Sequence, residues 1–167
     1  MSLTIDISHP DAALSIYEAA RECPQRLCLR TPEGDITFAE AAQKARRIFD
    51  TLELPAPGRP YVLRADTDVH SMLVFYALLA AHVPMLLLSP KLTEAEVRSY
   101  IRAAQAIDEP LPEDAAVVIF TSGTTGPSKP AVLSRRALAA NALAVGRHIE
   151  MTSEDIWLLS LSAARVG

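Results

Sequence analysis

The sequence predicts one α/β domain whose mostly parallel sheet is flanked by helices. Apolar strand-like runs alternate with helix-like stretches along most of the chain. A strand, helix, strand order around residues 61–89 is typical of a parallel pair joined by a right-handed crossover. The 167 residues, half of them hydrophobic, can build the core of one domain but are few for a two-domain enzyme. We therefore expect a single sheet with helices on both faces.

The first elements are expected within residues 11–52. Apolar residues at helical spacing predict a helix from Asp11 to Glu22, capped by Asp11 and ended by Pro24. The run "LCLRT" predicts a strand, and a turn and a short strand follow it. Thr37 then begins a helix, because Glu40 stands three residues later and completes a capping box.

The segment from residue 61 to residue 105 predicts two strands and two helices. The runs "YVLRA" and "MLLLS" are strand-like, and a strongly apolar helix from about Asp68 to His82 separates them. Thr93 and Glu96 form a second capping box and begin an amphipathic helix.

A proline-rich acidic stretch, "DEPLPED" at 108–114, is the expected internal boundary. It divides a partial N-terminal domain, residues 1–167, into a first α/β segment at 1–107 and a second segment at 115–167. In the second segment "AVVIF" and "AVLS" are expected strands, and a helix is expected at 134–149. The run "DIWLLSLS" at 155–162 predicts a last strand, with Trp157 packed in the core.

Charge and composition exclude several classes of partner. The formal net charge is −4 and no basic block occurs, which argues against nucleic acid or an anionic membrane surface. The apolar run at 71–90 is broken by His82 and Pro84, and no export signal is present, so a cytoplasmic protein without a membrane span is expected. Cys23 and Cys28 have no histidine at ligand spacing, which favours two reduced thiols over a zinc site.

The loop within "FTSGTTGPSKPAVLS", residues 120–134, combines glycines, hydroxyl side chains and one lysine. Unhindered backbone N–H groups and the Lys129 ammonium suit phosphate oxygens. The Walker A pattern fails because Pro127 and Ser128 separate Gly126 from Lys129, and no Rossmann fingerprint is present. Composition alone would equally fit a simple turn.

The order "TSGTTGPSK" resembles the phosphate-binding signature of the AMP-forming adenylating superfamily, which includes acyl- and aryl-CoA ligases. The run "DIWLLSLSAARVG" at 155–167 is similar to the next strand of that family, and "ITFAEAAQKARRIFDTL" is similar to an upstream segment. The likeness is nearest to the o-succinylbenzoate–CoA ligase branch and is strongest around the loop.

The resemblance implies a ligase that activates a carboxylic acid with ATP and Mg²⁺ to an acyl-adenylate and transfers the acyl group to CoA. Hydroxyls, loop amides and an ammonium would stabilise the negative charge that builds on the departing pyrophosphate. Lys129 would be the catalytic residue. The implied phosphate-binding residues are Thr121, Ser122, Gly123, Thr124, Thr125, Gly126 and Lys129.

Three positions depart from the family pattern. Pro130 replaces a glycine, which removes a backbone donor and stiffens the loop exit, and Ser162 replaces a proline. Arg165 stands where many of these ligases carry histidine. It could pair with an acidic group of the substrate, or it could be a surface residue, and the second reading is slightly favoured.

The chain lacks the family's adenine-binding motif, ribose-binding aspartate and C-terminal lysine. We therefore expect an N-terminal fragment of a ligase that is inactive alone and that self-associates through exposed apolar surface. The alternative is an inactive remnant that binds a phosphate ligand or a protein partner.

Overall fold

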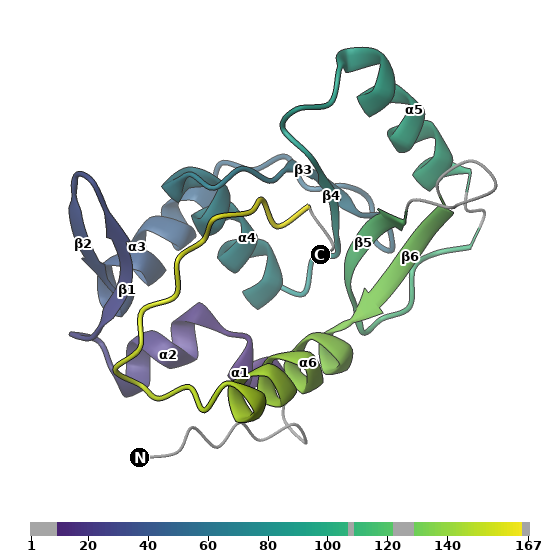
Figure 1. Cartoon of the computed structure of the whole chain (residues 1–167). Coiled ribbons are helices and arrows are strands. Elements are labelled where there is room, and N and C mark those ends of the chain that lie inside the picture. The colour runs from purple at the N-terminus through teal and green to yellow at the C-terminus, as the bar shows by residue number, and fades with distance from the viewer. Residues whose placement is uncertain (1–9, 107–108, 122–128, 165–167) are drawn as a thin grey trace.

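The computed structural model describes residues 10–106, 109–121 and 129–164, which form a mixed α/β fold (Figure 1). Among these residues, four strands form one sheet in the order β3-β4-β5-β6, and a hairpin, β1-β2, stands apart from it. The strands are β1 (Leu27–Thr31), β2 (Gly34–Thr37), β3 (Tyr61–Arg64), β4 (Met85–Leu88), β5 (Ala115–Thr121) and β6 (Lys129–Ser134). The helices are α1 (Pro10–Ala13), α2 (Ile16–Glu22), α3 (Phe38–Phe49), α4 (Val69–Ala80), α5 (Glu94–Gln105) and α6 (Arg135–His148).

The sheet is mostly parallel, as the sequence predicts. β3 pairs with β4 in parallel through Tyr61 and Met85, and β4 pairs with β5 in parallel through Leu86 and Val118. β6 is the exception, because it turns back from β5 and pairs antiparallel to it. The α4 crossover between β3 and β4 is the strand, helix, strand unit expected from the sequence.

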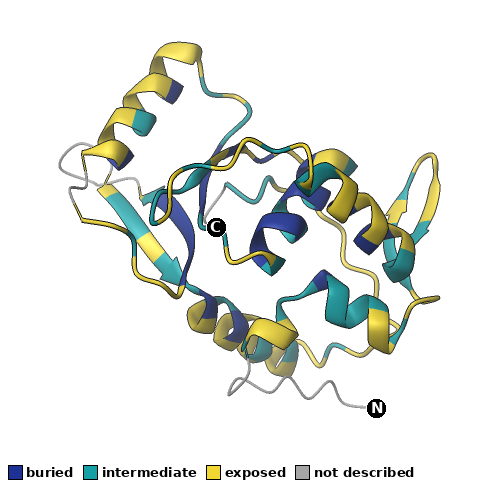
Figure 2. Cartoon of the chain, turned by 180° about the vertical axis from the view of Figure 1, so that it is seen from behind, coloured by how far each residue is buried: buried dark blue, intermediate teal, exposed yellow. Residues whose placement is uncertain are grey.

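Successive residues of the central strands point to opposite faces, so each strand supplies two hydrophobic clusters. Met85 and Val117 belong to the cluster that contains Leu78 of α4. Leu86 and Val118 belong to a second cluster, which contains Val97 of α5. Helices therefore cover both faces of the sheet, which confirms the predicted fold class. Figure 2 shows the buried residues concentrated on these strands and on α4, while much of α5 faces solvent.

A third cluster joins the helices on the α4 side of the molecule. Ala41 and Ala45 of α3 and Ala77 of α4 are fully buried, and Ile16 of α2 packs with them. Because alanine side chains are small, they allow the helix backbones to approach closely. Across the part of the chain that the structure describes, no helix is long and apolar enough to cross a membrane.

Both predicted capping boxes are present. The Thr37 hydroxyl accepts from the Glu40 N–H at 3.3 Å, and the Glu40 carboxylate accepts from the Thr37 N–H at 2.8 Å. Thr93 and Glu96 make the same pair of bonds at 3.3 and 2.7 Å. These reciprocal bonds satisfy backbone donors that a helix start otherwise leaves free.

The helix predicted from Asp11 to Glu22 is wrong in one respect, because it is broken into α1 and α2. Ser15 has an extended backbone and its hydroxyl accepts from the Glu18 N–H at 3.3 Å, so Ser15 is the N-cap of a new helix. Asp11 lies inside α1 rather than at a cap, and its carboxylate pairs with Arg135.

The strand predicted at 155–162 is also wrong. Residues 155–162 form no helix or strand, and residues 152–161 are exposed (yellow in Figure 2). Trp157, expected in the core, is 66% exposed. A strand needs a hydrogen-bonded neighbour, and no described strand pairs with this segment.

The division of the chain at 108–114 stays a prediction. The strands on its two sides, β4 and β5, pair within one sheet.

Candidate phosphate-binding site

The β5-β6 hairpin brings two of the predicted site residues together. Thr121 ends β5 and Lys129 begins β6, and the two residues are directly paired across the strands. The Thr121 hydroxyl also donates to the Lys129 carbonyl at 3.4 Å. Both residues are exposed, whereas the first five residues of β5 are buried. The hairpin therefore presents one hydroxyl and one ammonium side by side where a buried strand reaches the surface.

This pair lies at the carboxyl end of β5. Because β3, β4 and β5 are parallel, their carboxyl ends share one edge of the sheet. In open α/β sheets, ligands bind outside the carboxyl ends of the strands. Thr121 and Lys129 therefore lie where proteins with such a sheet usually bind their ligands.

Aromatic packing holds the end of β5 in place. The Phe120 ring lies against the Tyr100 ring of α5, with 4.5 Å between the ring centroids. Phe120 is also paired with Pro130 of β6. Proline has no N–H for a ladder, but β6 is an edge strand of the described sheet, where proline is tolerated. The Pro130 departure is thus compatible with the hairpin.

The other predicted site residues are not all accounted for. Ser122, Gly123, Thr124, Thr125, Gly126 and Arg165 lie outside the described residues. Within the described part of the chain, the ion pairs involve side chains other than Lys129. The Lys129 ammonium is therefore not neutralised by a described carboxylate.

Ser162 is a residue whose role the sequence reasoning missed. Its hydroxyl donates to the Ala65 carbonyl, directly after β3, and accepts from the Ala164 N–H at 3.1 Å. Ala163 and Ala164 then pack against the core. These contacts hold residues 162–164 at the carboxyl end of β3, on the same edge of the sheet as Thr121. The sequence did carry a signal for this role, because Ser162 places a hydroxyl where the family pattern has proline.

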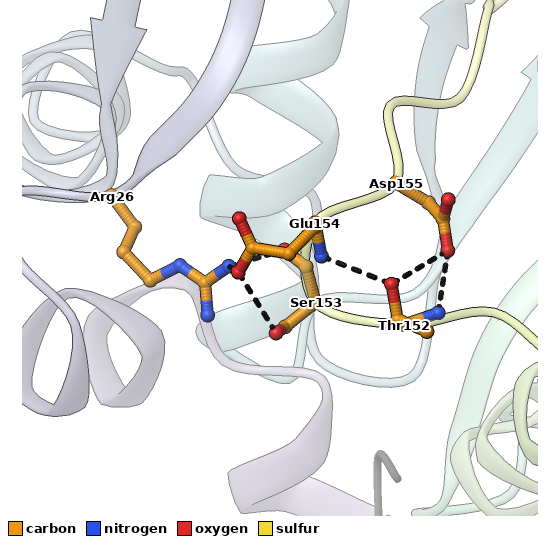
Figure 3. A network of polar contacts seen from close by, with 5 residues as sticks. All are labelled: Arg26, Thr152, Ser153, Glu154 and Asp155. Atoms are coloured by element: carbon orange, nitrogen blue, oxygen red, sulfur yellow. Dashed lines mark hydrogen bonds and ion pairs between the residues drawn. The ribbon is translucent and has the colours of Figure 1, made fainter. Parts of the chain in front are cut away.

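The beginning of the same segment is fixed by a polar network (Figure 3). Arg26, which precedes β1, pairs with the Glu154 carboxylate at 2.9 Å and also donates to the Ser153 carbonyl. The Asp155 carboxylate accepts from the Thr152 N–H at 2.6 Å and from its hydroxyl at 2.9 Å. These bonds hold the pKa of Asp155 below its ordinary value, and the bond from the Thr152 N–H has the larger effect.

Two further features limit what the described residues can bind. A groove of about 900 Å³ lies between residues 51–62 and α5, but neither Thr121 nor Lys129 lines it. Among the described residues, no group of three His, Cys, Asp or Glu side chains could hold a metal ion. The described part of the site therefore offers donors for an anion and no metal cage.

Comparison with known protein families finds a match around this site. Residues 104–166, which span the hairpin and the loop, match the model of the AMP-binding enzyme family. Sequence comparison with curated proteins gives no match.

Solved structures of similar fold cover most of the chain. MatB from Rhodopseudomonas palustris is 20% identical, with a TM-score of 0.74 over 94% of this chain and 40% of its own. The o-succinylbenzoate CoA synthetase MenE from Bacillus subtilis is 18% identical, with a TM-score of 0.72 over 88% of this chain and 49% of its own. The N-terminal subdomain of NpsA from Klebsiella oxytoca is 18% identical, with a TM-score of 0.62 over 78% and 42%.

The chain thus spans about half, or less, of the length of these structures. At such identities the structural likeness concerns the fold, and the family model adds the sequence match around the loop. The resemblance to the AMP-forming adenylating superfamily is supported: residues 104–166 match the model of the AMP-binding enzyme family, and the chain has the fold of the N-terminal part of such enzymes.

Proposed function

We infer that the chain is the N-terminal portion of an AMP-forming acyl- or aryl-CoA ligase and that residues 121–129 bind the phosphates of ATP. The observation that carries this proposal is the pairing of Thr121 with Lys129 at the carboxyl end of β5. The family match over residues 104–166 supports it, because that match includes the hairpin.

The chemistry assigned to the site is stabilisation of a leaving pyrophosphate. When a carboxylate attacks the α-phosphorus of ATP, negative charge builds on the β- and γ-phosphates. The Lys129 ammonium would donate to these oxygens, joined by the loop residues Ser122 to Gly126. The Thr121 hydroxyl would also donate to them by giving up its bond to the Lys129 carbonyl. Since a charged hydrogen bond contributes about 1.5–3 kcal/mol, losing Lys129 would weaken phosphate binding roughly tenfold to a hundredfold.

In the proposed reaction, Mg²⁺ would accompany the phosphates of the nucleotide. Mg²⁺ commonly binds through substrate phosphates with only one or two carboxylates. The acyl acceptor in the proposal is CoA, and the compartment is the cytoplasm. Arg165 would pair with an acidic group of the carboxylic acid substrate.

Binding of pyrophosphate to the 167-residue chain tests the phosphate site directly. We expect calorimetric titration to show weak binding that falls at least several-fold in Lys129→Ala. Lys44→Ala is the matched control, because Lys44 is an exposed lysine of α3, away from the hairpin. Equal binding by wild type and Lys129→Ala, or loss of binding in the Lys44 variant, would contradict the assignment.

Adenylation is tested separately by acid-dependent exchange of labelled pyrophosphate into ATP. In a longer protein that contains this chain, Lys129→Ala should lower the exchange rate without unfolding the domain. The 167-residue chain alone should not sustain exchange, because the family's adenine- and ribose-binding motifs are not in its sequence. Sustained exchange by the purified chain would overturn that expectation. Pyrophosphate binding without exchange in any longer protein would favour the inactive phosphate-binding remnant.

A further inference from the structure

A charged hollow of about 660 Å³ lies at the base of the β5-β6 hairpin. At this base the N–H of Arg135, which follows β6, donates to the carbonyl of Asp114, which precedes β5, at 2.8 Å. α1 and α6 lie side by side there (Figure 1). The volume falls within the roughly 300–1,000 Å³ that is usual for small-molecule sites. The ionisable residues that line the hollow are Asp11, His82, Glu113, Asp114, Arg135 and Arg136.

Arg135 lines the hollow with a hydrogen-bond donor that is not used. Its side chain is only 4% exposed, its Nε binds Asp11, and its Nη1 donates to the Leu79 carbonyl. Among the described residues, its Nη2 has no hydrogen-bond partner, although it is buried. A buried polar atom of this kind is costly, and one explanation for it is a bound group that is not part of the chain. The hollow therefore suits an anionic group beside Arg135.

The start of α6 is a second reason to expect an anion in the hollow. Arg135 and Arg136 are the first two residues of this helix, and its first turn holds no acidic residue. The amino end of a helix is its positive pole, so cations there are unfavourable and an anion is favoured. Arg136 is also exposed and takes no part in the described ion pairs. An acidic group that binds both arginines would offset this concentration of positive charge.

The hollow also holds negative charge that the described residues do not neutralise. Glu113 and Asp114 are exposed, and none of the described ion pairs includes them. The Asp11 carboxylate, in contrast, is already paired with Arg135. The charges left without a described partner are therefore two carboxylates and the guanidinium of Arg136. A ligand complementary to them carries two cationic groups and one anionic group.

We propose that this hollow binds a basic amino acid, of the chemical class of lysine and ornithine. The ligand carboxylate accepts from Arg136 and, after a small outward shift of the half-exposed Asp11 side chain, from Nη2 of Arg135. The two ammonium groups of the ligand lie against Glu113 and Asp114.

This site is separate from the proposed phosphate site. The hollow lies where β5 begins, whereas Thr121 and Lys129 are paired where β5 ends. The seven residues of β5 span roughly 20 Å. The inference is therefore independent of the proposed ligase function, and each of the two can fail without the other.

Calorimetric titration of the 167-residue chain with three probes tests the class of ligand. L-lysine should bind most tightly. L-alanine lacks the second ammonium group and 1,5-diaminopentane lacks the carboxylate. Each should bind roughly tenfold or more weakly than L-lysine, because each loses a charged hydrogen bond. Failure of L-lysine to bind, or equal binding of L-lysine and either of the other probes, would overturn the proposal.

Variants test whether the ligand occupies the hollow. Arg136→Gln should weaken L-lysine binding roughly tenfold and leave 1,5-diaminopentane binding unchanged, since only L-lysine has a carboxylate. Glu113→Gln should weaken the binding of both probes. Arg147→Gln and Glu109→Gln are the matched controls, because they change an exposed arginine at the other end of α6 and an exposed acid outside the hollow. Lys129→Ala should bind L-lysine like wild type.

Circular dichroism should be the same for wild type and all of these variants, because each changes an exposed side chain. Tight L-lysine binding that persists in both Arg136→Gln and Glu113→Gln would overturn the assignment to the hollow. An equal loss of binding in the two control variants would overturn it as well, because the attraction would then depend on the overall charge of the chain.

Discussion

Arg135 and Asp11 form an ion pair that joins the last described helix to the first. Arg135 Nε lies 2.5 Å from Asp11 Oδ1. The Arg135 side chain is 4% exposed and the Asp11 side chain is 58% exposed, so a buried guanidinium meets a half-exposed carboxylate. Arg135 also donates to the Leu79 carbonyl in the last turn of α4. One side chain at the start of α6 thus ties α1 and α4 together.

Asp11→Ala should destabilise the fold. Arg135 Nη2 is already buried without a hydrogen-bond partner, so the guanidinium has little to replace the lost carboxylate. Uncompensated buried charges are costly, but Asp11 is largely exposed to solvent, and we expect a loss of about 1–3 kcal/mol in the free energy of unfolding. Urea denaturation measures this value.

Glu109→Ala is the control, because it changes an exposed acid outside the described ion pairs, and it should cost less than about 0.5 kcal/mol. Equal values for the two variants would refute the role given to the pair.

Acid should destabilise the helix starts. Hydrogen bonds from Thr37 and Thr93 hold the pKa values of Glu40 and Glu96 below 4.5, and bonds from Ser71 do the same for Asp68 relative to 3.8. A carboxyl whose pKa is lower in the folded state contributes stability above its unfolded pKa and loses it as pH falls through the folded pKa. The melting temperature should therefore be level near neutral pH and fall below about pH 4.5.

Thr93→Val tests the cause of this acid sensitivity. Valine preserves the shape of threonine but removes the hydroxyl that binds Glu96, so the fall in melting temperature below pH 4.5 should be shallower. Thr67→Val is the control, because Thr67 is exposed and lies outside the capping boxes. An identical pH profile for Thr93→Val and wild type would exclude the capping box as a contributor.

Structural features that depend on residues close together in the sequence could be predicted. Features that depend on contacts between residues far apart in the sequence could not. The capping boxes at Thr37 and Thr93 were predicted because residues three apart form them. Ser15 and Glu18 have the same spacing, so the break between α1 and α2 carried a usable signal. The exposure of Trp157 carried none, because its burial depends on whether another segment lies against it.

The candidate site follows the same rule. The composition of the loop predicted phosphate donors around Lys129, and the two flanking strands were expected from their apolar runs. The pairing of Thr121 with Lys129 depends on the register of β5 against β6, which spacing alone does not determine. The contact of Ser162 with Ala65 joins residues far apart in the sequence and could come only from the fold.

Cys28 should react slowly with thiol reagents. The pKa of the Cys28 thiol is raised from 9.0 to about 11. Burial is the larger cause, and the neighbouring Cys23 is the smaller one. Since the thiolate is the reactive form, the shift lowers its fraction at pH 8 roughly a hundredfold. Mass spectrometry after brief alkylation should find Cys28 largely unmodified in the native protein and modified in urea. Equal labelling in both states would contradict the prediction.

Ser162→Ala should loosen the exposed segment at residues 156–161 from the sheet. The Ser162 hydroxyl binds the carbonyl of Ala65, which is 2% exposed, and also holds the Ala164 N–H. Alanine removes both bonds and leaves a nearly buried carbonyl without this donor, which costs about 1–3 kcal/mol in the free energy of unfolding.

Release of that end should also make the exposed residues from Trp157 to Leu161 easier to cleave, because local opening exposes a backbone to proteases. Chymotrypsin digestion under native conditions, followed by mass spectrometry, measures cleavage after Trp157 and the nearby leucines. Ser160→Ala is the matched control, since it changes an exposed serine of the same segment and keeps the Ser162 bonds. If Ser162→Ala and Ser160→Ala are cleaved at the same rate and unfold at the same urea concentration, the Ser162 contact does not anchor the segment.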